Sequence, residues 1–178
     1  APTAGLHFTG ATLDKLRNKL DVDTITLHVG AGTFKPVKTD TMEQHEMHSE
    51  FIDVSISTIE KIRNYTGGFV TAVGTTSLRT IESLYWMGVK TVLDKKISQE
   101  DLIVHQWDPY ELPQNELTPS QAMSSLLNWM LSKNISRLIT KTQILIAPGY
   151  EMKLTNALVT NFHQPQSTLL LLVAAFIV

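Results

Sequence analysis

The stretch Phe69-Val-Thr-Ala-Val-Gly-Thr-Thr-Ser-Leu78 decides the fold class of this chain. Residues 69–73 are apolar or β-branched, a pattern typical of a buried strand. Gly74 breaks the strand. Apolar residues at helical spacing follow it: Leu78, Ile81, Leu84 and Tyr85. The stretch therefore predicts a strand, a turn and a helix in succession, which is the basic unit of an α/β protein.

Strand-like and helix-like segments alternate along the rest of the chain. Alternating or β-branched residues predict strands over residues 24–29, 50–54, 143–147 and 157–160. Capping residues predict helices that follow Thr9 and Ser57, and helical spacing predicts another over residues 120–132. The apolar residues 168–176 form a final helix or strand. This alternation predicts an α/β domain with a largely parallel sheet, and it leaves open whether the sheet closes into a barrel.

The composition fits one globular domain without disulfides. The chain has 178 residues, 43% of them hydrophobic and 18% charged, and it contains no cysteine. The lack of thiols excludes disulfides, thiolate zinc sites, iron–sulfur clusters and a cysteine nucleophile. The 15 Lys and Arg against 17 Asp and Glu give a net charge of −2. The chain therefore lacks the basic excess of proteins that are held to nucleic acid mainly by charge.

The two ends of the chain predict a cytoplasmic piece of a longer polypeptide. The longest apolar run, residues 169–178, is about half as long as a bilayer span requires. No signal-peptide pattern precedes the first predicted helix. The chain begins at Ala1 without Met and ends inside an apolar run that needs a packing partner. We therefore expect residues 1–178 to form a single, incomplete domain.

The turn that follows the strand at 69–73 is a candidate anion site. Gly74, Thr75 and Thr76 place backbone N–H groups and hydroxyls at a helix N-terminus, where the helix dipole favours a carboxylate or phosphate. The alternative is that Thr75 or Thr76 is only the N-cap of the helix. Arg79 and Glu82 lie three residues apart on that helix, so they either reach a ligand or form an exposed pair.

A histidine between two carboxylates is a candidate proton-transfer group. Glu46, His48 and Glu50 share one face if residues 45–51 are extended. The carboxylates would orient the imidazole and move its pKa. The same three residues also fit a metal site or a solvated edge strand.

Three other histidines lie in apolar sequence surroundings, where each is either a hydrogen-bonded core residue or a catalyst: His7, His28 and His163. Basic residues at helical spacing form a stripe, either solvated or in contact with phosphates, if the helix at 120–132 continues: Lys133, Arg137 and Lys141.

Several segments, taken in order, resemble the S-adenosylmethionine:tRNA ribosyltransferase-isomerases of queuosine biosynthesis. The segments are Pro2-Thr-Ala-Gly-Leu-His-Phe-Thr9, Leu27-His-Val-Gly-Ala-Gly-Thr-Phe-Lys-Pro-Val37, Met47-His-Ser-Glu50, Val73-Gly-Thr-Thr-Ser-Leu-Arg-Thr-Ile-Glu-Ser83, Thr160-Asn-Phe-His163 and Ser167-Thr-Leu-Leu170. The resemblance covers nearly the whole chain and is weakest over residues 90–140.

The resemblance implies a reaction, a cosubstrate and an architecture. It implies that the ribosyl part of S-adenosylmethionine is transferred to the aminomethyl group of 7-aminomethyl-7-deazaguanine in a tRNA anticodon. Adenine and methionine leave, epoxyqueuosine results, and no metal is needed. It also implies a barrel-like large domain of mixed, mainly parallel strands with flanking helices. The family's N-terminal part and its inserted small β-barrel domain are missing here. We expect tRNA as the partner, no membrane contact and a monomer.

The motifs and the resemblance together give two sets of candidate site residues. The candidates for proton transfer are His7, His48, Glu50 and His163. The candidates for binding S-adenosylmethionine are Gly30, Gly32, Thr33, Gly74, Thr75, Thr76, Arg79 and Asn161. One departure from the family pattern is that Gln164 and Gln166 replace Leu and Lys, which removes a positive charge near this expected site.

Two other classes of function remain open from the sequence. One is a metal-dependent hydrolase that uses His45, His48 and Glu50, although His45-Glu-Met-His48 is one residue short of the HExxH zinc motif. The other is a domain that binds a nucleotide or tRNA without catalysis.

Overall fold

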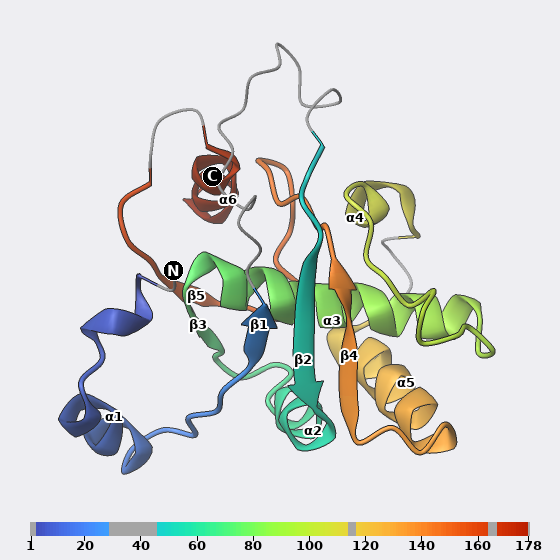
Figure 1. Cartoon of the computed structure of the whole chain (residues 1–178), viewed down its shortest axis with the longest axis horizontal. Helices are drawn as coiled ribbons and strands as arrows, with labels where there is room; N and C mark the ends of the chain where they lie inside the picture. The colour runs from blue at the N-terminus through green and yellow to red at the C-terminus, as the bar shows by residue number, and fades with distance from the viewer. Residues whose placement is uncertain (1–2, 29–45, 114–116, 164–166, 178) are drawn as a thin grey trace.

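The computed structural model describes residues 3–28, 46–113, 117–163 and 167–177 (Figure 1). It combines helices and strands in one α/β arrangement, as the sequence predicts. In chain order the elements are η1 Gly5–His7, α1 Gly10–Arg17, β1 Thr26–His28, β2 Glu50–Ser55, α2 Ile56–Asn64, β3 Thr71–Val73, α3 Thr75–Leu93, α4 Asp108–Glu111, α5 Pro119–Ser132, β4 Arg137–Thr142, β5 Ala157–Val159 and α6 Thr168–Ile177.

The strands form two small sheets. The larger has the order β1-β2-β4 and is antiparallel throughout, whereas β3 and β5 form a parallel pair. The prediction of a mainly parallel sheet was therefore wrong for the larger sheet. Alternation of strands and helices along the chain does not reveal pairing between distant strands such as β2 and β4. Among the described residues, the strands do not close into a barrel.

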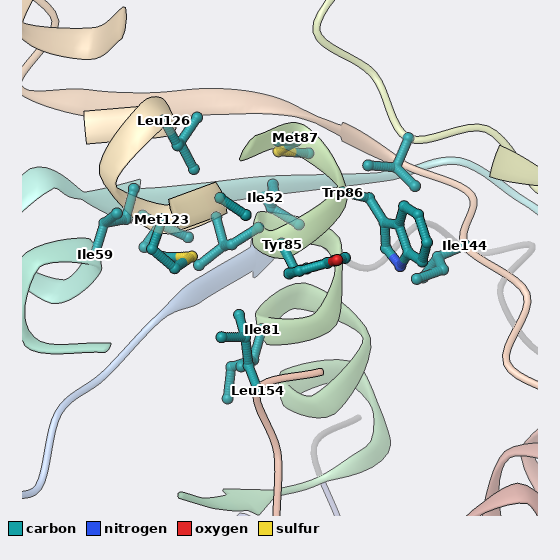
Figure 2. Close-up of a cluster of buried hydrophobic side chains, with 14 of the residues drawn as sticks. Ile52, Ile59, Ile81, Tyr85, Trp86, Met87, Met123, Leu126, Ile144 and Leu154 are labelled. Atoms are coloured by element: carbon teal, nitrogen blue, oxygen red, sulfur yellow. The ribbon is translucent and has the colours of Figure 1, made fainter. Parts of the chain in front are cut away.

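Helix α3 is the centre of the fold. It passes behind the three-stranded sheet and packs against α5 (Figure 1). Most of its side chains are buried, so it contributes on all sides to the hydrophobic core shown in Figure 2. The core residues labelled there are Ile52, Ile59, Ile81, Tyr85, Trp86, Met87, Met123, Leu126, Ile144 and Leu154.

Local capping explains where the helices begin. The Thr9 hydroxyl accepts a hydrogen bond from the Thr12 N–H, which confirms Thr9 as the N-cap of α1. Thr118 and Gln121 form a capping box at the start of α5. Ser57 was wrong as the cap of α2, since the Ser55 hydroxyl accepts from the Thr58 N–H at 3.1 Å.

The segment that precedes β5 differs from the sequence-based expectation. The predicted strand at 143–147 is wrong, because β4 ends at Thr142. The next residues form other bonds: the Ile144 N–H donates to the Thr142 hydroxyl, and the Ala147 N–H donates to the Tyr110 hydroxyl. Their apolar character reflects burial in the core, and the Gln143 and Leu145 N–H groups donate to the carbonyls of Val104 and Gln106 without forming a regular strand. The predicted basic stripe is also wrong, since α5 ends at Ser132 and its continuation forms β4.

The apolar C-terminal segment is a helix, α6, and it buries only Leu172 fully. Among the described helices, none combines the length and the apolar character that crossing a membrane requires.

Candidate active site

The turn from β3 into α3 lies at the edge of the parallel sheet. Gly74 is the N-cap of α3 and has φ of 96°, a conformation that favours glycine. Its N–H donates to the Val159 carbonyl at 2.8 Å, which ties the turn to the end of β5. Neither Thr75 nor Thr76 is the cap, and no side chain caps this helix N-terminus. The interpretation of the two threonines as mere caps was therefore wrong.

The residues after β5 lie at the same edge of this sheet. Because β3 and β5 are parallel, their carboxyl ends meet there, which is where ligands bind in many α/β sheets. His163 Nε2 lies 2.8 Å from the Thr160 hydroxyl, and the Asn161 side-chain oxygen accepts from the Phe162 N–H. Partial burial lowers the pKa of the His163 imidazole. The fold thus brings the Gly74 turn and the segment 160–163 together.

A buried ion pair lies one turn further along α3. The Arg79 Nη1 donates to Glu50 Oε2 at 2.8 Å, and Arg79 Nε donates to the Ile144 carbonyl at 3.2 Å. Glu50 is 0% exposed and Arg79 is 4% exposed. Burial lowers the pKa of the Arg79 guanidinium, and the negative charge of Glu50 opposes that shift. The pair links the start of β2 to α3.

Two atoms of this pair have no hydrogen-bond partner among the described residues. They are Glu50 Oε1 and Arg79 Nη2, and both are buried. Buried polar atoms are nearly always hydrogen-bonded, and an unsatisfied charged group costs more than a neutral one. Within the part of the chain that the structure describes, the pair therefore leaves one buried acceptor and one buried donor unsatisfied.

Glu82 has a different role from Arg79. Its carboxylate accepts from the Tyr150 hydroxyl at 2.8 Å and from the backbone N–H groups of residues 153, 154 and 155 at 2.8–3.0 Å. Burial raises the pKa of the Tyr150 hydroxyl well above its ordinary value, and the Glu82 charge adds to that shift. The expectation that Arg79 and Glu82 form an exposed pair is wrong, since both are buried and bind different partners. These hydrogen bonds hold the segment before β5 against α3.

The three residues of the predicted proton-transfer group, Glu46, His48 and Glu50, differ in how far they are buried. Glu46 is exposed, His48 is half-buried and Glu50 is fully buried, so a solvated edge strand is wrong for Glu50. Met47 holds the segment, since its N–H donates to Gln106 Oε1 at 2.8 Å.

The remaining candidates have varied surroundings. His7 in η1 and His28 in β1 are exposed, so neither is a core histidine. Four candidates lie outside the described residues: Gly30, Gly32, Thr33 and His45. The two positions that depart from the family pattern, Gln164 and Gln166, also lie outside them. Within the described ranges, no three His, Asp or Glu side chains gather closely enough to hold a metal ion.

Three groups around the ion pair and His163 were missed by sequence reasoning. The Ile144 carbonyl fixes Arg79, and the Thr160 hydroxyl contacts His163. The Ser83 hydroxyl lies 2.7 Å from that of Thr142 on β4. Of these, only Thr160 could have been found from the sequence, because it lies three residues before His163 and can contact it locally.

Comparison with known proteins shows the family of this chain. Residues 1–178 match the protein family described as "Queuosine biosynthesis protein". A protein of Buchnera aphidicola subsp. Acyrthosiphon pisum (strain Tuc7) is 38% identical over 99% of this chain and 39% of its own length. A protein of Thermosipho africanus (strain TCF52B) is 40% identical over 99% of this chain and 40% of its own length. Both are named S-adenosylmethionine:tRNA ribosyltransferase-isomerase.

A solved structure is also similar to this chain. The crystal structure of S-adenosylmethionine tRNA ribosyltransferase from Thermotoga maritima has a TM-score of 0.53 and 31% identity. The match covers 97% of this chain and 40% of that one. This chain therefore spans about two fifths of the length of the relatives that it matches.

Proposed function

Because this chain belongs to the queuosine biosynthesis protein family, we propose that it carries out the ribosyl transfer and isomerisation for which its relatives are named. The proposed cosubstrate is S-adenosylmethionine, and the acceptor is the aminomethyl group of 7-aminomethyl-7-deazaguanine in tRNA. The products are epoxyqueuosine in tRNA, adenine and methionine. The observation that carries the proposal is the buried Glu50–Arg79 pair, which leaves one donor and one acceptor unpartnered among the described residues.

The reaction needs a base, an acid and a site for the methionine carboxylate. The positive sulfonium acidifies the C5′ hydrogens of the ribose, so a nearby base can remove one of them. The bond between adenine and C1′ then breaks, and a proton supplied by an acid neutralises the departing base. As the C4′–O4′ bond opens to leave a carbonyl at C1′, the acceptor amine forms a C–N bond to C4′. C5′ then bonds to C1′ and closes the carbon ring, and the C1′ oxygen displaces methionine from C5′ to form the epoxide.

Arg79 and the N-terminus of α3 are proposed to bind the carboxylate of the methionine part. Arg79 Nη2 has no acceptor within the described ranges, and a helix N-terminus without a side-chain cap favours negative charge. Thr75, Thr76 and Asn161 are proposed to contact the ribose hydroxyls, because they lie at the two strand ends that meet at this edge.

His163 is the proton acceptor that the chemistry supports best. Its lowered pKa keeps the imidazole neutral at pH 7, and a neutral imidazole can take a proton. Glu50 is engaged by Arg79, so we assign it to holding the guanidinium in place, with His48 nearby in sequence. His48 and His7 are retained as proposed acids or alternative bases.

Adenine release tests the proposal directly. The protein is incubated with S-adenosylmethionine and with tRNA that carries the aminomethyl-deazaguanine, and adenine and the modified base are measured by mass spectrometry. The Thermotoga maritima relative is run in parallel as a positive control, to check that the S-adenosylmethionine and the tRNA can react. Adenine that forms only with this tRNA, with the matching mass gain on the base, supports the transferase. If the relative releases adenine and this protein does not, the transferase proposal fails.

An Arg79→Lys variant tests the carboxylate site. A lysine has the charge but not the two-pronged donor geometry. Loss of one charge-assisted hydrogen bond, about 1.5–3 kcal/mol, raises KM for S-adenosylmethionine by about tenfold or more. Arg17→Lys is the matched control, because Arg17 is exposed on α1. An unchanged KM in Arg79→Lys would remove Arg79 from the site.

The architecture and the surroundings of the protein form part of the same proposal. We propose that the two sheets belong to a barrel-like large domain, incomplete in residues 1–178, and that the protein acts as a cytoplasmic monomer. Light scattering on a sizing column tests the last point, since a single species at 19.9 kDa is expected for the chain.

A further inference from the structure

The side of the three-stranded sheet that faces away from α3 carries exposed apolar and basic side chains. Strand alternation sends Ile52 and Val54 into the core and sends Phe51 to the opposite side. In Figure 1, α3 passes behind this sheet, and no described element lies in front of it. We call this side the outer sheet face, and its residues are Thr26, His28, Phe51, Asp53, Arg137, Ile139 and Lys141.

One row across the outer sheet face combines an aromatic ring with two basic side chains. Phe51 on β2 is opposite His28 on β1 and opposite Lys141 on β4. Lys141 Nζ lies 4.7 Å from the centroid of the Phe51 ring, within the range of a cation–π contact. Phe51 is nevertheless 47% exposed. The ammonium group thus lies over the ring, and the ring remains partly exposed to solvent.

A second apolar side chain extends the surface. Ile139 is 51% exposed and lies diagonally from Phe51, two residues along β4 from Lys141. Large apolar side chains that adjoin one another on an open face are typical of a contact surface. The outer sheet face therefore carries two exposed apolar side chains, Phe51 and Ile139, with Lys141 beside them and with Asp53 on the central strand opposite Ile139.

The charges of this face suit an anionic partner. Arg137 and Lys141 are permanent cations, whereas Asp53 is the face's one carboxylate and already accepts from Arg137 Nε at 2.8 Å. Within the described residues, Lys141 forms no ion pair. The whole chain, by contrast, has a net charge of −2. Because Arg137 is paired with Asp53, Lys141 is the cation of this face that no described carboxylate neutralises, and it lies at the exposed ring.

We propose that the outer sheet face binds unpaired bases of the tRNA substrate. One base stacks on the Phe51 ring and Ile139, and the adjacent phosphates contact Lys141 and His28. Single-stranded RNA is recognised in this way, by base stacking on exposed aromatic rings together with cations that follow the backbone. The proposal rests on the proposed function for the identity of the RNA. It also explains how a protein without a basic excess can bind tRNA, because few phosphate contacts are needed.

Direct RNA binding tests the proposal independently of catalysis. Fluorescence anisotropy of the purified chain is measured with the hairpin of a tRNA anticodon arm and with a fully paired RNA duplex of equal length. The hairpin should bind more tightly than the duplex. Phe51→Ala should weaken hairpin binding about tenfold, since stacking of one base contributes about that much. Phe51→Trp should preserve it, and Lys141→Glu should reduce the salt dependence of binding by about one phosphate contact.

Two exposed residues elsewhere give matched controls. Phe69→Ala removes a ring that is 74% exposed outside this face, and Lys15→Glu reverses an exposed charge on α1. Both should leave hairpin binding unchanged. The urea midpoint of every variant is measured, so that loss of folding is not mistaken for loss of binding.

The possible results separate this proposal from the transferase. If the wild-type chain does not distinguish hairpin from duplex, or if Phe51→Ala binds normally, the RNA surface is overturned even when adenine release is intact. If adenine is never released but hairpin binding depends on Phe51, the transferase fails and the surface stands. A dimer in light scattering that Phe51→Ala dissociates would assign the face to a second copy of the chain and would also overturn the proposal.

Discussion

At the scale of single residues, the buried Glu50–Arg79 pair is expected to contribute strongly to stability. Removal of one partner of a buried pair leaves an uncompensated charge and typically costs about 3–5 kcal/mol. We therefore expect Arg79→Met to lower the free energy of unfolding by that amount. The double variant Glu50→Leu/Arg79→Met removes both charges and should recover much of the loss, because hydrophobic replacements of a whole pair are often neutral. Urea denaturation measures both; equal losses in the single and double variants would contradict the expectation.

His163 makes stability depend on pH in a defined direction. Its pKa is lower in the folded protein than the ordinary 6.5, because partial burial disfavours the charged ring. The unfolded chain therefore binds a proton more readily, and the free energy of unfolding should fall as the pH drops below about 6.5. His163→Gln should remove that part of the pH dependence, whereas substitution of the exposed His7 should not. An NMR titration in which His163 protonates at or above 6.5 would contradict this.

Single residues also show what sequence can and cannot predict about the site. Gly74 as a strand–helix turn and Glu50 and Arg79 as candidates follow from local pattern. Their pairing does not, since the two residues lie 29 positions apart and belong to different elements. Glu82 illustrates the limit: from sequence it is a helix-surface carboxylate, but its donors include a tyrosine 68 residues away. Burial of a charged group depends on tertiary partners, which local patterns do not contain.

At the scale of elements, the packing of α3 on α5 depends on the absence of a side chain at Gly88. A Cβ at this position would lie 2.2 Å from the carbonyl oxygen of Ala122, which is backbone and cannot easily move. Overpacking usually costs about 1–3 kcal/mol. We expect Gly88→Ala to reach at least the upper end of that range, although alanine is the better helix former. Gly10→Ala in α1 is the control, because no atom lies within 4 Å of its added Cβ. A neutral Gly88→Ala in thermal unfolding would show that the helices separate readily.

Elements were predictable where a local interaction defines them. The Thr9 cap and the helix after Gly74 follow from short-range chemistry, and the structure confirms both. The strand at 143–147 was wrong because an apolar, β-branched run has the same pattern whether it pairs as a strand or is buried as a loop. In the structure the strand is the more polar segment before it, Arg137–Thr142, whose alternate residues face solvent.

At the scale of the whole molecule, α3 connects two sheets that do not pair with each other. Arg79 binds β2 of the larger sheet, and Glu82 binds the segment that leads into β5 of the smaller one. The edge that carries Gly74 and His163 is therefore positioned by contacts on both sides of one helix. No periodicity in the sequence contains this arrangement, because it arises from pairing between residues far apart along the chain.

Glu82 gives the test of that arrangement. Glu82→Ala leaves three backbone N–H groups and the Tyr150 hydroxyl without their acceptor, at about 1–3 kcal/mol for each unpaired group. Tyr150→Phe removes one of the four bonds and should cost much less, while Glu60→Ala on the exposed face of α2 should cost almost nothing. Hydrogen exchange should show the loss first at the amides of residues 153–155 and later at those of β4. If the β4 amides in Glu82→Ala lose as much protection from hydrogen exchange as those of residues 153–155, the two sheets unfold as one unit. That result would contradict the view that α3 connects two parts that can unfold separately.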